Sequence, residues 1–183
     1  MTVTAEPVLH PDHAETSSRR RMRHWPAPLG AFLVYGSMLA AGLIGASVDS
    51  AGKGGTQLTG MDIYLHNLVL GAAIAVLGWT SLGIAAAFLA VVGSAQIGYV
   101  IGAHIGSLGW APTMALLPHF VPETLAFTAF TIAGLYGARW VVDVIAGNPI
   151  RQAITQGARY AAAYLSAGIV LVSIAGALEA TTL

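Results

Sequence analysis

A stretch of sixty residues, from Ile63 to Pro122, contains no Asp, Glu, Lys or Arg. About 20 residues of helix cross a bilayer core of about 30 Å, so one helix of this length would be about three times too long. The stretch must therefore turn back at least once. Segments that combine glycines with a tryptophan occur at residues 78–83 and 106–112. Both predict turns near a membrane interface.

The composition of the whole chain indicates the same class of protein. Charged residues make up 9% of the 183 residues and hydrophobic residues 56%, and the mean hydropathy is +0.71. Soluble domains carry about 25% charged residues. We therefore predict an all-α fold, a polytopic transmembrane helical bundle. The formal net charge of zero argues against a nucleic-acid partner, and the absence of cysteine excludes disulfides and thiolate chemistry.

The amino-terminal segment differs from the rest of the chain. It holds three prolines and a run of four arginines, Arg19, Arg20, Arg21 and Arg23. We predict that residues 1–26 form a flexible polar and basic tail and that residues 27–183 form a single transmembrane domain. A secretory signal peptide is the alternative. The apolar run from Ala27 to Val48 is long enough to span the membrane, which favours a retained first span.

Hydropathy and turn residues divide the domain into spans. Five are predicted, at residues 27–48, 63–79, 83–105, 118–140 and 160–178. Residues 107–117 are a candidate re-entrant segment. The segment from Trp140 to Gln156 mixes apolar and polar residues around Pro149, which predicts a short interfacial helix interrupted at the proline.

The placement of lysine and arginine predicts the orientation. With the amino terminus inside, the arginines of the tail, Arg139, Arg151 and Arg159 all lie in the cytoplasm, and only Lys53 lies outside. This distribution satisfies the positive-inside rule. We therefore expect five spans with the amino terminus inside.

The third predicted span carries small residues at every fourth position. They are Ala86, Ala90, Ser94, Gly98, Gly102 and Gly106. Residues four apart share a helix face, and small side chains on that face let another backbone approach closely. We interpret this ridge as a helix-packing seam within the chain. A homodimer interface is the alternative.

Several polar side chains are predicted near the outer ends of the spans. His119 and Glu123 stand four residues apart on one face, in a segment with prolines at 118 and 122 that predicts either the start of a helix or a break in one. His66, Asn67, His104 and Glu179 complete the expected polar cluster. Ionisable groups at membrane depth are functional candidates because they are costly to place there.

The polar cluster admits three interpretations. His119 and Glu123 are the candidate catalytic residues, as a base with an orienting acid, or as two ligands of a divalent metal such as zinc with His66 or His104 as a third. The cluster can instead satisfy broken helix ends by hydrogen bonding, or line a transport pathway. No metalloprotease His-Glu-x-x-His pattern is present in the sequence.

Three sequence blocks resemble one bacterial membrane protein family. They are His66-Asn67-Leu68-Val69, Leu116-Leu117-Pro118-His119 with Glu123, and the closing Ile174-Ala175-Gly176-Ala177-Leu178-Glu179-Ala180. The chain resembles the stage II sporulation protein M family over residues 29 to 183. The family pattern places a glycine after the histidine of the second block, where this chain has Phe120.

The resemblance implies a location and a choice of functions. The expected location is the bacterial cytoplasmic membrane, with lipids, a second copy of the chain and a separate ATPase or peptide-processing protein as partners. The family's short members resemble components of circular bacteriocin gene clusters. This implies a non-catalytic scaffold or transport component in peptide maturation or export, immunity or envelope remodelling. The alternative is a membrane-embedded hydrolase or peptide ligase that uses His119 and Glu123 at the extracytoplasmic face.

Overall fold

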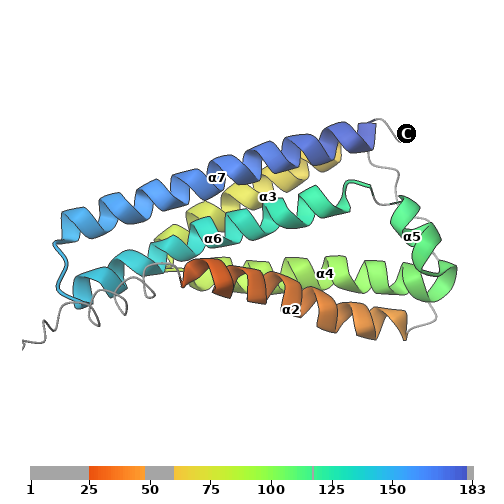
Figure 1. Ribbon diagram of the computed structural model, residues 1–183, viewed down its shortest axis with the longest axis horizontal. Helices are drawn as coiled ribbons and strands as arrows, with labels where there is room; N and C mark the ends of the chain where they lie inside the picture. The colour runs from red at the N-terminus through yellow and green to blue at the C-terminus, as the bar shows by residue number, and fades with distance from the viewer. Residues whose placement is uncertain (1–24, 48–59, 117, 181–183) are drawn as a thin grey trace, which may run out of the picture.

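The computed structural model describes residues 25–47, 60–116 and 118–180, which contain helices and turns and no strand (Figure 1). The helices are α2 (Pro26–Ala46), α3 (Gly60–Thr80), α4 (Ile84–Leu108), α5 (Trp110–Leu116), α6 (Phe120–Ile145) and α7 (Ile150–Ala180). The predicted all-α bundle is confirmed. Most of the predicted tail, residues 1–24, lies outside the described residues.

The long helices correspond to the predicted spans. Four of them, α2, α4, α6 and α7, are long and apolar enough to cross a membrane, and α3 contributes a shorter apolar helix at Tyr64–Thr80. Large apolar side chains on these helices face outward, including Phe32 (72% exposed) and Ile84 (74% exposed). Contact of these side chains with lipid tails costs no free energy, whereas contact with water is unfavourable.

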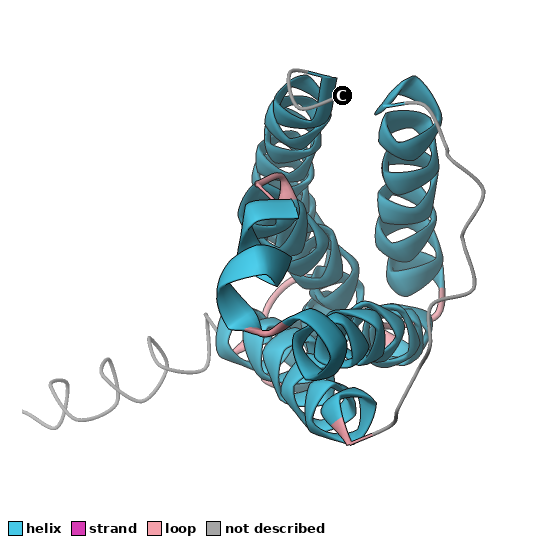
Figure 2. Ribbon diagram, turned by 90° about the vertical axis from the view of Figure 1, so that its right-hand side faces the viewer, coloured by secondary structure: helices cyan, strands magenta, loops and turns pink. Residues whose placement is uncertain are grey.

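Helix α6 occupies the centre of the bundle. It contacts α2, α3, α4 and α7, and every residue from Ala126 to Gly137 is buried. The hydroxyl groups of Thr124, Thr128 and Thr131 donate to carbonyl oxygens four residues earlier in the helix, so these buried polar groups are satisfied within α6 itself. Figure 2 looks along the bundle from the end that carries α5.

The turn between α3 and α4 lies where the sequence predicts it. Leu82 and Gly83 both adopt positive φ, 55° and 86°, a conformation that glycine adopts without strain. The hydroxyl of Ser81 accepts a hydrogen bond from the amide of Ala85 at 2.8 Å, which satisfies one donor at the start of α4.

The small-residue ridge of α4 packs against α2. A Cβ atom added at Gly98 would overlap the carbonyl oxygen of Met38, and one at Gly102 would overlap that of Gly42. Between these helices, the hydroxyl groups of Ser37 and Ser94 lie 2.5 Å apart. This part of the ridge is therefore occupied by α2, and a second copy of the chain would have to use a different surface.

One predicted element is wrong. Trp140 to Gln156 is not an interfacial helix: α6 continues to Ile145, and α7 begins at Ile150. Gly147, with φ 88°, ends α6. The carbonyl of Pro149 accepts hydrogen bonds from the amides of Gln152 and Ala153, so the proline precedes α7 rather than interrupting a helix.

The candidate re-entrant segment is mostly helical. Gly109, with φ 84°, ends α4, and α5 follows as a helix of seven residues at the end of the bundle (Figure 1). Helix α6 starts at Phe120, so the prolines at 118 and 122 mark the start of a helix rather than a break inside one.

Candidate functional site

Glu123 and Asn67 join two helices at the end of the bundle near α5. Glu123 lies in the first turn of α6, and the side-chain amide of Asn67 on α3 donates a hydrogen bond of 2.5 Å to its Oε1 atom. The two residues are 56 positions apart in the chain. A hydrogen bond to a carboxylate is stronger than one between neutral groups, so the contact fixes the position of the carboxylate and ties α3 to α6.

His119 lies one turn before Glu123. Its Nε2 atom is 3.9 Å from Oε2 of Glu123, and the two side chains are 17% and 22% exposed. Its Nδ1 atom is buried and has no hydrogen-bond partner among the described residues. The His119–Glu123 contact predicted from the spacing is therefore present.

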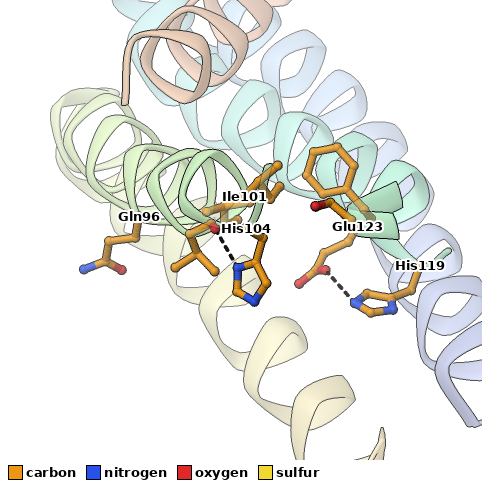
Figure 3. Close-up of a pocket in the computed structure, with 9 residues that line it drawn as sticks. Gln96, Ile101, His104, His119 and Glu123 are labelled. Carbon is orange, nitrogen blue, oxygen red and sulfur yellow. Dashed lines mark hydrogen bonds and ion pairs between the residues drawn. The ribbon is translucent and has the colours of Figure 1, made fainter. Parts of the chain in front are cut away.

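His104 approaches from α4. Its Nδ1 atom lies 2.8 Å from the carbonyl oxygen of Val100. Because a carbonyl can only accept, Nδ1 carries the hydrogen, and in the neutral ring Nε2 is the acceptor. Figure 3 shows the imidazole of His104 and the carboxylate of Glu123 facing each other across the space between α4 and α6.

These side chains line a cavity of about 330 Å³. Its walls combine apolar and polar residues: Gln96, Ile97, Val100, Ile101, His104, Thr113, His119, Phe120 and Glu123. A smaller cavity of about 130 Å³ is also lined by Gln96, Ile97 and Glu123 and reaches His66 and Asn67 on α3. A mostly apolar cavity of this size with a few convergent polar groups is typical of a ligand-binding site.

The structure brings together most of the predicted polar residues. Asn67, His104, His119 and Glu123 lie around the two cavities, and the exposed His66 lines the smaller one. The side chain of Glu179 lies outside the described residues. Within the described part of the chain, no three His, Asp or Glu side chains are grouped so that they could hold a metal ion. The proposed third ligand is therefore not in place there.

Two residues of the cavity were missed by the sequence analysis. Gln96 is the only glutamine in the uncharged stretch from Ile63 to Pro122, a signal that could have identified it. Thr113 is fully buried, and its hydroxyl donates to the carbonyl of Gly109 at 2.8 Å. No sequence pattern singles out this threonine.

A second polar cluster lies toward the opposite end of α6. Arg139 is 2% exposed, and its Nε and Nη2 atoms donate to the carboxylate of Asp143 at 3.1 and 3.2 Å. Its guanidinium lies 6.0 Å from the ring centre of Tyr136, which stacks on Tyr160 and Tyr164 of α7. The i, i+4 spacing of Arg139 and Asp143 could have predicted this pair.

Together, the apolar outer surface and the long apolar helices define a polytopic helical membrane protein with a cavity at one end of the bundle. The chain belongs to the family described as Stage II sporulation protein M, which matches residues 29–182. The family resemblance seen in the sequence is thereby confirmed. No curated protein and no solved structure matches the chain.

Proposed function

We propose that this protein is a non-catalytic scaffold or transport component of the bacterial cytoplasmic membrane. It acts in peptide maturation or export, immunity or envelope remodelling, together with a separate ATPase or peptide-processing partner. Family membership supports a membrane role. The cavity beside Glu123 supports a role in binding.

The observation that carries this proposal is the hydrogen bond from Asn67 to Glu123 at the wall of the cavity. It holds a carboxylate in a fixed position between α3, α4 and α6. A fixed polar group in an apolar cavity recognises a ligand by its position and charge. Recognition of this kind does not require the carboxylate to transfer a proton.

The second candidate is a membrane-embedded hydrolase or peptide ligase. The proximity of His119 to Glu123 favours it, because a general base and its orienting group pair an imidazole with a carboxylate in this way. The Nε2 and Oε2 atoms are 3.9 Å apart, which is longer than a hydrogen bond. The two functions differ in what they require of His119. An enzyme needs the imidazole to take up and release a proton, whereas a scaffold or transport component needs only its shape and polarity.

The substitution His119→Gln separates the two functions. Glutamine still donates a hydrogen bond but cannot act as a general base near neutral pH. In a strain that lacks the chromosomal copy, we expect the variant to restore at least roughly half of the phenotype lost on deletion, whereas removal of a general base costs about 100-fold or more. The measurement compares complementation of the export, immunity or envelope defect at matched membrane levels.

A variant with an intact fold is needed for the comparison. The apparent melting temperatures of His119→Gln and of wild type are therefore compared in detergent, and similar values show that the variant is folded. If the folded variant does not complement the deletion strain, the non-catalytic proposal fails, and the hydrolase or peptide ligase is the remaining candidate.

A further inference from the structure

Two polar side chains of the larger cavity, Glu123 and His104, present hydrogen-bond acceptors to it. Among the described residues of the wall there is no lysine, arginine or aspartate, and Glu123 is the one acidic side chain. The Nε2 atom of neutral His104 is an acceptor because Nδ1 binds Val100. The cavity therefore matches a ligand group that donates several hydrogen bonds and carries positive charge.

The remaining wall of the cavity is apolar. Ile97, Val100, Ile101 and Phe120 lie beside the acceptor groups. A ligand that fills this space needs an apolar part close to its donor group. The amino terminus of a peptide has this arrangement, because the ammonium group and the side chain of the first residue are attached to the same carbon.

We propose that this cavity binds the free, protonated amino terminus of a peptide whose first residue is apolar. The choice of a peptide rests on the proposed function, whereas the requirement for an ammonium group rests on the acceptors. The ammonium group pairs with Glu123 and donates to His104, and the first side chain lies against Ile101 and Phe120.

An amine-bearing lipid fits the same wall less well. In phosphatidylethanolamine the amine is two carbons from a phosphate. That phosphate would lie near the carboxylate of Glu123 and the Nε2 acceptor of His104. The negative carboxylate would repel it, and the His104 acceptor could not donate a hydrogen bond to it. The peptide amino terminus carries no such anion beside its ammonium group.

Binding of two matched peptides tests the proposal. The probes are a leucine-initiated tetrapeptide with an amidated carboxyl end and a fluorophore at that end, and the same peptide acetylated at its amino terminus. Fluorescence anisotropy is measured with the purified chain in phosphatidylcholine nanodiscs. We expect the free peptide to bind about ten-fold or more tightly than the acetylated one, because acetylation removes the charge that pairs with Glu123.

Three variants locate the binding site. Glu123→Gln keeps an acceptor for Asn67 but loses the charge, so we expect it to remove most of the difference between the peptides. Val100→Trp fills the cavity from an exposed position and should weaken both peptides. Arg151→Gln removes one exposed charge near the start of α7. Arg151 does not line this cavity, so the variant should change neither affinity.

Equal affinity for the two peptides, no binding of either, or an unchanged preference in Glu123→Gln would overturn the proposal. The free peptide is also challenged with phosphatidylethanolamine nanodiscs and with phosphatidylcholine nanodiscs at the same mole fraction. If phosphatidylethanolamine displaces the peptide and phosphatidylcholine does not, the proposal is overturned and the cavity is assigned to a lipid. The complementation result for His119→Gln is independent of these outcomes, so failure of the ligand assignment can be distinguished from failure of the proposed function.

Discussion

Asp143→Ala is expected to destabilise the protein by about 3 to 5 kcal/mol, because it leaves the guanidinium of Arg139 buried without its carboxylate partner. Arg139 is 2% exposed, and Asp143 accepts from two of its nitrogen atoms. Its Nη1 atom has no hydrogen-bond partner among the described residues even in the wild-type chain. The loss is measured as a fall in the apparent melting temperature in detergent.

Two further variants separate the ion pair from a general effect of charge. The double substitution Arg139→Met with Asp143→Leu removes both partners, so we expect most of the lost stability to return. Arg151→Gln removes an exposed arginine that forms no ion pair with the described residues, and should change stability by less than about 0.5 kcal/mol. If Asp143→Ala is as stable as Arg151→Gln, the pair does not stabilise α6.

Gly102→Ala is expected to separate α2 from α4. The added methyl group would overlap the backbone carbonyl of Gly42, and a main-chain atom cannot move away as a flexible side chain can. We expect a loss of about 2 to 3 kcal/mol and a fall of roughly 5 to 10 °C in the apparent melting temperature.

Gly36→Ala on α2 is the matched control. A Cβ atom there would have one neighbour, the ring of Phe32, at 3.9 Å. Alanine is the better helix former, so this variant should be as stable as wild type or more stable by up to about 1 kcal/mol. Equal stability of the two alanine variants would show that the ridge of α4 does not depend on close backbone contact with α2.

Most of the fold could be predicted because the signals for helices and turns are local. The uncharged stretch from Ile63 to Pro122 required a turn, and Gly83 supplied the conformation for it. The four-residue period of the ridge indicated close packing, although it could not identify α2 as the partner. The segment around Pro149 was mispredicted because its charges were taken to lie at a membrane surface. Asp143 instead neutralises the buried Arg139 within α6.

The site could be predicted only in part. The i, i+4 spacing placed His119 beside Glu123 because both lie at the start of one helix. The hydrogen bond from Asn67 to Glu123 depends on how α3 packs against α6, which no local pattern encodes. Gln96 and Thr113 join the site for the same reason: the packing of α4, α5 and α6 around the cavity determines which polar side chains face it.

Cysteine labelling tests the membrane-spanning bundle most directly, because the chain has no cysteine of its own. Ser107→Cys lies at the end of α4 near α5, and Gln152→Cys lies at the start of α7, at the other end of the bundle; both positions are exposed. In intact cells, a membrane-impermeant maleimide should label Ser107→Cys, and it should label Gln152→Cys only after permeabilisation. Labelling of both variants in intact cells would contradict the spanning bundle, and labelling of Gln152→Cys alone would contradict its orientation.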